Sequence, residues 1–163
     1  MSRLAPLHRL AAGAIALALW CVASSTSAQV ASGSQPAADP GKKLDRSGHQ
    51  RIGKASFYAR KFAGRKMANG KPMNPHRDIA ASKTLPLGTK ARVTNLQTGR
   101  SAVVTIEDRG PYVRGRIVDL SPSTAEKIGL TPKVGVTTVA VAPIEVPLPD
   151  GSVKPGAGAA SAD

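Results

Sequence analysis

The stretch from Ile106 to Ser121, which reads IEDRGPYVRGRIVDLS, constrains the fold of this chain most. It begins at the end of an apolar run and re-enters a second apolar run before it ends. Gly110-Pro111 breaks regular structure between the two runs, so the pattern predicts two short strands joined by a loop. Asp108 and Arg109 then lie where the first strand gives way to the loop. A carboxylate in that position is held firmly by the strand and can still reach a groove.

This Asp-Arg pair is open to two interpretations. Asp108 can cap the loop while Arg109 neutralises it, which is the common role of such pairs in turns and the one that the local sequence alone favours. Alternatively, Asp108 can act as an acid or base in a groove. The guanidinium of Arg109 would then orient this carboxylate or contact an anionic ligand.

The first 28 residues are typical of a secretory signal peptide. Arg3 and Arg9 precede an apolar stretch, and the small-x-small pattern at 26–28 predicts cleavage after Ala28. The apolar stretch is shorter than the roughly 20 residues that a membrane span needs, so we expect no stable membrane anchor. A lipoprotein signal has a small residue before its cysteine, whereas Trp20 precedes Cys21. We therefore expect export to the periplasm or cell envelope without lipidation.

The rest of the chain is predicted to contain one domain. Residues 29–50 are rich in Ala, Ser, Gly, Pro and charge, which is typical of a flexible linker, and 147–163 has a similar composition. We expect a folded domain over 51–146 and a disordered tail after it. No internal repeat is present, and the chain is expected to be a monomer.

Composition excludes several classes of function. After removal of residues 1–28 the chain has no cysteine, so no disulfide, thiolate nucleophile or cysteine metal ligand is available. No metal-ligand spacing, phosphate loop or nucleotide fingerprint occurs, and we expect no metal and no cofactor. Only four aromatic residues remain, too few for a ladder that stacks bases. The 21 basic and 10 acidic residues give a net charge of +11, which for an exported protein indicates an anionic envelope polymer rather than nucleic acid.

The domain is predicted to be all-β with one or two short helices. Apolar runs flank a hairpin signal at 96–99, and Ser121-Pro122 predicts a helix start that Gly129 would end. Strands are expected over 54–58, 90–95, 100–106, 117–120 and 136–141. Many short strands with Gly and Pro turns favour a closed barrel, because closure removes sheet edges. The segment 60–71 carries five basic residues and no acid; it could line a groove for an anionic polymer or be a solvated loop.

Seven stretches in this order resemble the rare lipoprotein A (RlpA) family of bacterial envelope proteins, over nearly the whole domain. They are Gly53–Tyr58 (GKASFY), Gly64–Gly70 (GRKMANG), Ala80–Gly88 (AASKTLPLG), Val93–Asn95, Gly99–Ser101, Asp108–Pro111 (DRGP) and Arg116–Ser121 (RIVDLS). The resemblance implies a six-stranded double-psi β-barrel, similar to barwin-like and expansin domains. It also implies an endolytic peptidoglycan transglycosylase, a lyase that acts on glycan strands in cell wall organisation and septation.

The site that the resemblance implies is only partly kept. The family pattern has a Glu after Asn-Gly, an Asp three residues later, and a His before Lys-Thr-Leu-Pro. This chain has Lys71, Asn74 and Ser82 at those positions, whereas Asp108 is retained. Asp108 is therefore the candidate catalytic residue. The candidate substrate-binding residues are Tyr58, Arg65, Lys71, Asn74, Ser82 and Arg109.

Two functions are compatible with a site that keeps Asp108 but lacks the other acids and the histidine of the family pattern. A single carboxyl group on Asp108 could act first as acid and then as base in lytic cleavage, which leaves a 1,6-anhydromuramic end. Glu107 would point to the opposite face of its strand, and Asp119 could be either a nearby acid or a structural partner of an arginine. His76 could replace the missing histidine or lie in a solvated loop. The alternative function is a non-catalytic, expansin-like module that binds peptidoglycan.

Overall fold

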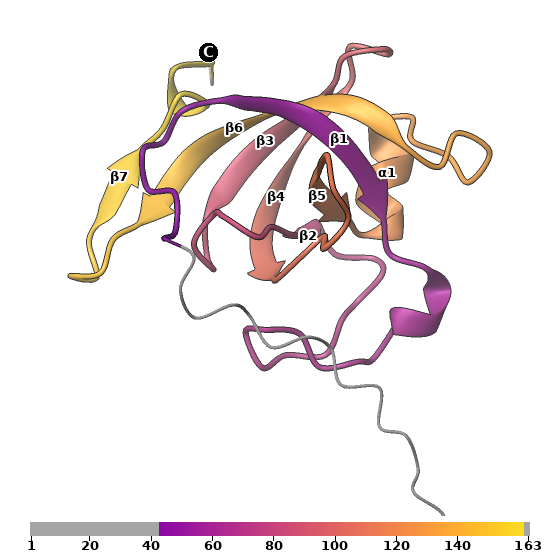
Figure 1. Cartoon of the computed structure of the whole chain (residues 1–163), viewed down its shortest axis with the longest axis horizontal. Helices are drawn as coiled ribbons and strands as arrows, with labels where there is room; N and C mark the ends of the chain where they lie inside the picture. Colours follow the sequence, from indigo (N-terminus) through magenta and orange to yellow (C-terminus); the bar gives the residue numbers. More distant parts are fainter. Residues whose placement is uncertain (1–42, 162–163) are drawn as a thin grey trace, which may run out of the picture. The chain divides into compact units, whose positions relative to one another are not determined.

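The computed structural model describes residues 43–161, and these form a β-barrel with little helix (Figure 1). The strands are β1 (Arg51–Phe57), β2 (Ile79–Ala81), β3 (Lys90–Asn95), β4 (Ser101–Asp108), β5 (Arg116–Leu120), β6 (Thr137–Pro147) and β7 (Val153–Pro155). The helical segments are η1 (Arg60–Phe62), α1 (Pro122–Lys127) and η2 (Ala159–Ser161). The all-β prediction with short helices is confirmed.

Six of these strands close into a ring. The order is β1-β5-β2-β4-β3-β6, and β6 pairs back onto β1, while β7 lies outside the ring on β6. The pairs β1–β5 and β2–β4 are parallel, and the other neighbours are antiparallel. The predicted closed six-stranded double-psi barrel is therefore confirmed.

The core fills the inside of this ring. Along β3 and β4 the side chains of Ala91, Val93, Val104 and Ile106 are buried, at most 1% exposed, and their neighbours are more exposed. This period of two follows from the pleat of a strand, which sends successive side chains to opposite faces. The predicted hairpin at 96–99 joins these two strands in antiparallel register.

The predicted helix after Ser121-Pro122 is present as α1. The Ser121 hydroxyl accepts a hydrogen bond from the Thr124 amide at 3.2 Å, which satisfies one of the free amides at the helix start. Gly129, in the left-handed region at φ 76°, follows its last residues. Ile128 and Leu130 are fully buried, so the end of this helix closes the core.

Strand β2 was not predicted as a strand, because three residues are too few to show a period. Its backbone nevertheless joins β4 on one side and β5 on the other. The β4 strand ends toward the long 58–78 loop, which lies below the barrel in the view of Figure 1. This end of the barrel is where Asp108 lies.

The prediction of a disordered tail over 147–163 is wrong for the residues that the structure describes. β6 extends to Pro147, and β7 returns along it. The amide of Gly158 donates to the Pro143 carbonyl at 2.7 Å, and a Cβ on Gly156 would lie 2.3 Å from that carbonyl oxygen. The composition resembles that of a linker, yet glycine allows this close approach of two backbones.

The predicted linker over 29–50 also needs a correction at its end. The Asp45 amide donates to the Thr84 carbonyl at 2.8 Å, and the Gly48 carbonyl accepts from Ala157 at 2.9 Å. Residues 43–50 thus pack on the domain. The predicted signal peptide, its Cys21 and most of the linker lie outside the described residues. Within the described part of the chain, no helix is long and apolar enough to cross a membrane.

Candidate active site

Asp108 is the last residue of β4 and is only 5% exposed. Its Oδ1 accepts from the amides of Ala68 and Arg109, both at 2.8 Å, and its Oδ2 accepts from the Tyr58 hydroxyl at 2.8 Å. The Ala68 amide comes from the 58–78 loop, 40 residues away in sequence. Three donors around one carboxyl group fix its position and orientation.

The Tyr58 hydroxyl remains protonated and donates to this carboxylate. Burial raises the pKa of Tyr58 far above its ordinary value, and the negative charge of Asp108 raises it further. Tyr58 also packs against Phe62 edge to face, with the ring centroids 5.9 Å apart. The tyrosine thus fixes the carboxyl group on one side and η1 on the other.

Glu107 is the extra residue of a β-bulge, because Ala80 pairs with Ile106 and Ala81 with Asp108, so the simple alternation predicted for Glu107 and Asp108 is interrupted there. Its carboxylate pairs with Arg77 at 2.8 Å and accepts from the Asn69 amide group at 3.0 Å. Its side chain is 8% exposed, so this ion pair is largely buried on the Glu107 side. Two consecutive acids of β4 therefore hold the 58–78 loop, one through Asn69 and Arg77 and the other through Ala68.

The guanidinium of Arg109 makes no hydrogen bond to the Asp108 carboxylate. Its Nη1 donates instead to the carbonyls of Ser82 (3.1 Å) and Leu85 (2.7 Å), while only the Arg109 backbone amide reaches Asp108. Burial lowers the pKa of Arg109 from its ordinary value. Arg109 therefore ties the end of β4 to the 82–85 turn, and its guanidinium does not orient the Asp108 carboxylate directly; binding of an anionic ligand by Arg109 stays a prediction.

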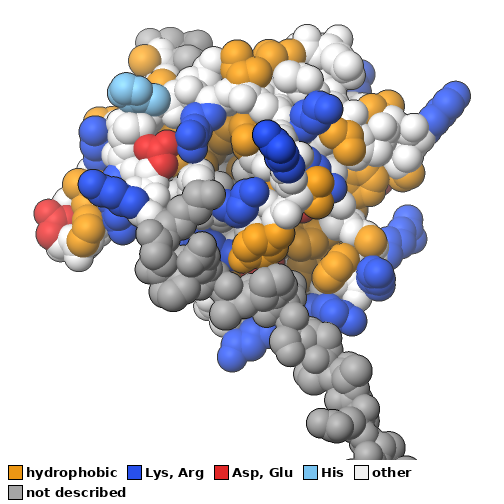
Figure 2. Space-filling view, viewed as in Figure 1, with side chains coloured by type: hydrophobic (Ala, Val, Ile, Leu, Met, Phe, Trp, Pro, Cys, Tyr) orange, Lys and Arg blue, Asp and Glu red, His pale blue; other side chains and the backbone are white. Residues whose placement is uncertain are grey.

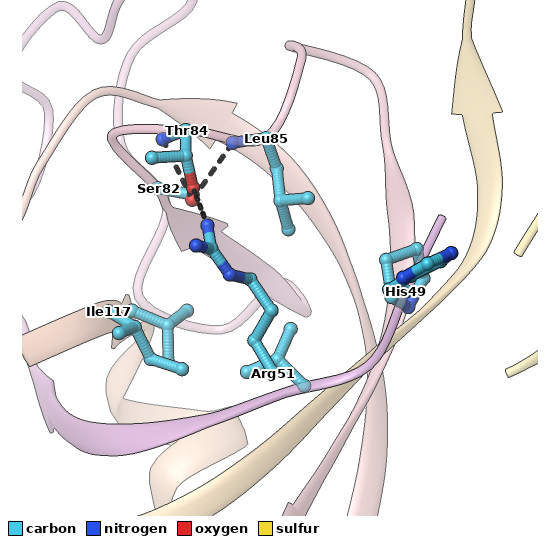
Figure 3. A pocket seen from close by; sticks show the side chains of 9 residues that line it. His49, Arg51, Ser82, Thr84, Leu85 and Ile117 are labelled. Carbon is cyan, nitrogen blue, oxygen red and sulfur yellow. Dashed lines mark hydrogen bonds between the residues drawn. The ribbon is translucent and has the colours of Figure 1, made fainter. Parts of the chain in front are cut away.

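Ser82 is 1% exposed, and its hydroxyl belongs to the same turn (Figure 3). The hydroxyl accepts from the amides of Leu85 at 3.2 Å and Thr84 at 3.4 Å. Arg51, on the other side, donates to the Thr84 hydroxyl at 3.2 Å. The crevice between them has about 10 Å³ of free volume, room for about one water molecule. These contacts give Ser82 a structural role and leave no space for a sugar beside it.

The other predicted binding residues lie on the surface of the 58–78 loop. Lys71 and Arg65 are exposed, and the Arg65 guanidinium lies 5.5 Å from the centre of the Phe62 ring. Asn74 is also exposed, and its side-chain oxygen accepts from the His76 amide, closing a local turn. None of these three side chains bonds to Asp108. In Figure 2, Lys and Arg side chains clearly outnumber Asp and Glu on the visible face, in keeping with the net charge.

Comparison with known proteins identifies the domain. A family described as lytic transglycolase matches residues 50–141. The chain belongs to this family. Relatives include the endolytic peptidoglycan transglycosylase RlpA of Pasteurella multocida, 54% identical over 84 residues, which are 52% of this chain and 29% of the relative. The protein of the same name from Vibrio cholerae is 42% identical over 102 residues, 63% of this chain and 38% of the relative. The chain thus spans about a third of the length of these relatives.

Solved structures are also similar to this chain. Streptomyces papain inhibitor is 25% identical, with a TM-score of 0.44, over 57% of this chain and 92% of the inhibitor. An expansin of Clavibacter michiganensis is 20% identical, with a TM-score of 0.46, over 61% of this chain and 52% of the expansin.

Asp119 is a second acid whose role the sequence leaves open. Ala81 of β2 pairs with Asp108 on one side and with Asp119 of β5 on the other. Residues paired across neighbouring strands face the same side, so the two acids are two strand spacings apart, about 10 Å between Cα atoms. The Asp119 carboxylate accepts from the Ser56 hydroxyl at 2.6 Å and lies 3.4 Å from Arg116.

Burial raises the pKa of Asp119, although the Ser56 hydrogen bond and the Arg116 charge oppose this shift. Its side chain is 16% exposed and can reach solvent. The charge of Asp119 also raises the pKa of Tyr58, by less than burial and Asp108 do. The sequence signal for this residue was weak: a single acid within an apolar strand.

Proposed function

We propose that this protein is an endolytic peptidoglycan transglycosylase that cleaves glycan strands in the periplasm, as an unlipidated monomer, during cell wall organisation. The observation that carries the proposal is Asp108: a carboxylate fixed by three donors, at the end of strand β4, in a domain of the lytic transglycolase family. The relatives are named endolytic peptidoglycan transglycosylases, which supports the substrate class.

The chemistry needs a proton for the glycosidic oxygen and a base for the 6-hydroxyl of the muramic acid. Once deprotonated, the 6-oxygen attacks the anomeric carbon, the glycosidic bond breaks, and a 1,6-anhydro ring forms. The three donors hold the Asp108 carboxyl group in one place, and we assign it the role of the base that accepts the hydroxyl proton. A single carboxyl group could also perform both steps, if it donated its proton first.

Asp119 supplies the proton in the arrangement that we favour. Its raised pKa keeps it protonated to a higher pH than an ordinary aspartate, as a general acid requires. The two acids differ in surroundings, with two backbone amides and a phenol around Asp108, and a serine hydroxyl and an arginine beside Asp119. Such a difference separates the base from the acid in other carboxylate pairs.

The proposal is tested by incubating the protein with purified glycan strands and searching for 1,6-anhydromuramic ends by mass spectrometry. Asp108→Asn should reduce product formation about 10²- to 10⁴-fold, the usual contribution of a general acid or base. Asp150→Asn, in the exposed 148–152 turn, is the matched control and should cleave like the wild type. Absence of anhydro products from wild-type protein at any pH from acidic to neutral would contradict the enzymatic function.

The second candidate function is a module that binds peptidoglycan without cleaving it. It is favoured by Lys71, Asn74 and Ser82, which replace the acids and the histidine of the family pattern. In that case Asp108→Asn would have no activity to reduce. Retention of the protein on insoluble sacculi would then weaken with added salt, because the exposed basic loop would supply much of the attraction.

A further inference from the structure

Tyr112 is an aromatic residue that the proposed chemistry does not use. It lies in the 109–115 loop, which joins β4 to β5 and so connects the two strands that carry Asp108 and Asp119 (Figure 1). Tyr112 is 50% exposed, and it is the only exposed residue among Phe, Tyr and Trp within 43–161. A phenol ring has a large apolar surface and a polar tip, so half of this surface is open to a ligand.

The ring lies at the edge of the row that contains the two acids. A Cβ built on Gly110 would be 3.8 Å from Cε2 of Tyr112 and 4.0 Å from the Cβ of Ala81. The ring and the Ala81 side chain therefore both approach Gly110. Ala81 pairs with Asp108 on one side and with Asp119 on the other. The exposed ring thus borders the strand position that separates these acids.

Electrostatic coupling agrees with this position. Burial lowers the pKa of Arg109, and the Tyr112 hydroxyl opposes this shift more than the Asp108 carboxylate does. Tyr112 also raises the pKa of Tyr58, by less than burial and Asp108 do. The phenol of Tyr112 is therefore coupled to two residues that contact Asp108.

Hydrogen bonds hold the loop that carries this ring. At its start, the Arg109 guanidinium donates to the carbonyls of Ser82 at 3.1 Å and Leu85 at 2.7 Å. At its end, the Arg116 amide donates to the Val113 carbonyl at 3.3 Å. Because the loop is tied at both ends, the fold has already met part of the entropic cost of ordering it for a ligand.

An exposed phenol ring beside acids fits a pyranose sugar. In a β-1,4-linked chain of N-acetylated sugars the ring substituents are equatorial, and axial C–H groups make both faces of each sugar apolar. Such a face packs flat on an aromatic ring, while the polar groups at its rim stay free for other partners. A sugar held in this way fixes the position of the glycosidic bond next to it.

We propose that Tyr112 is a stacking platform that binds one sugar of the glycan strand next to Asp108 and Asp119. The inference rests on the proposed function for its substrate class. It predicts that loss of the aromatic ring weakens glycan binding, whether or not the strand is cleaved, and that loss of the hydroxyl alone does not.

The test measures binding to the full chain by isothermal titration calorimetry. The ligand is a soluble, peptide-free tetrasaccharide of alternating N-acetylglucosamine and N-acetylmuramic acid. Tyr112→Ala should raise the dissociation constant about ten-fold, whereas Tyr112→Phe should bind within about two-fold of the wild type. This loss should be equal at low and high salt, because stacking is not screened as charge attraction is. Val153→Ala removes a similarly exposed apolar side chain from β7, outside the ring of six strands, and should bind like the wild type.

NMR signals of the tyrosine rings give a second readout that needs no destabilising variant. The chain has two tyrosines, and Tyr112→Phe assigns their signals. The Tyr112 signals of the wild type should shift and saturate with the same tetrasaccharide. In an active protein, Tyr112→Ala should raise KM more than it lowers kcat.

Three results would overturn this inference. They are Tyr112 signals that do not move at millimolar tetrasaccharide, wild-type affinity in Tyr112→Ala, or equal losses in Tyr112→Ala and Tyr112→Phe, which would indicate a hydrogen bond of the hydroxyl instead. Neither binding readout depends on cleavage. A protein that binds the tetrasaccharide through Tyr112 and forms no anhydro ends would support the platform and contradict only the proposed enzymatic function.

Discussion

Asp108→Asn should destabilise the domain as well as stop its chemistry. Asparagine keeps the size of the side chain, and its oxygen can still accept from the amides of Ala68 and Arg109, which both meet the same carboxylate oxygen at 2.8 Å. Its amide nitrogen would then face the Tyr58 hydroxyl at the place of Oδ2. Since the nitrogen donates rather than accepts, the phenol must turn its proton elsewhere.

The size of this effect follows from the number of bonds to the carboxylate. A hydrogen bond to a charged group contributes about 1.5–3 kcal/mol, and one between neutral groups about 0.5–1.5 kcal/mol. Replacing three charged bonds by neutral ones therefore costs about 3 kcal/mol in the free energy of unfolding. Asp108 is 5% exposed, so solvent screens little of this. For a domain of this size the melting temperature should fall by roughly 10 °C.

Circular dichroism during heating measures this change. Asp108→Ala should be less stable than Asp108→Asn, because it leaves both backbone amides without an acceptor, whereas Asp150→Asn should melt close to the wild type. Alkaline absorbance titration adds a second measurement, since Tyr58 and Tyr112 are the only tyrosines. Loss of the Asp108 charge should lower the pKa of Tyr58, while burial keeps it above the ordinary value.

Two results would refute this reasoning. An Asp108→Asn variant as stable as the wild type would mean that the carboxylate does not hold these donors. A destabilised variant that still forms anhydro ends at the wild-type rate would leave Asp108 as an anchor of the 58–78 loop and remove it from the chemistry.

Three further perturbations address other parts of the fold. Arg77→Ala leaves the buried Glu107 carboxylate with fewer partners and should lower the free energy of unfolding by about 1–3 kcal/mol, measured by urea unfolding. An unchanged urea midpoint would mean that water replaces the guanidinium. Asp119 has a raised pKa in the folded state, so its contribution to stability is full below its unfolded pKa of about 3.9 and is lost as pH rises through the folded value. The stability advantage of wild type over Asp119→Asn should therefore shrink from about pH 4 to neutral pH in the same assay; a constant advantage would contradict the raised pKa. Gly156→Ala forces a Cβ against the Pro143 carbonyl and should release the C-terminal segment to limited proteolysis, whereas cleavage at the wild-type rate would show that the backbone can shift.

Patterns within a few residues predicted much of this fold. The hairpin at 96–99, the capped start of α1 and the closed barrel were all found as expected. Turn residues and a period of two act locally, which is why they are readable. The alternation of apolar residues did not predict β2, because this strand is too short to show a period. Composition was misleading for 148–161, where Gly and Pro indicated disorder but allow close backbone packing.

The sequence by itself determined that Asp108 lies at the end of a strand and that the domain is a basic β-barrel. Only the tertiary structure decided which groups surround that carboxyl group. Its donors at Tyr58 and Ala68 lie 50 and 40 residues away in the sequence. Asp119 lies two strands from Asp108, because Ala81 of β2 pairs with both acids. Contacts between residues so far apart in sequence form only when the barrel closes. No local pattern predicts them, because the sequence around each residue would also suit other contact partners.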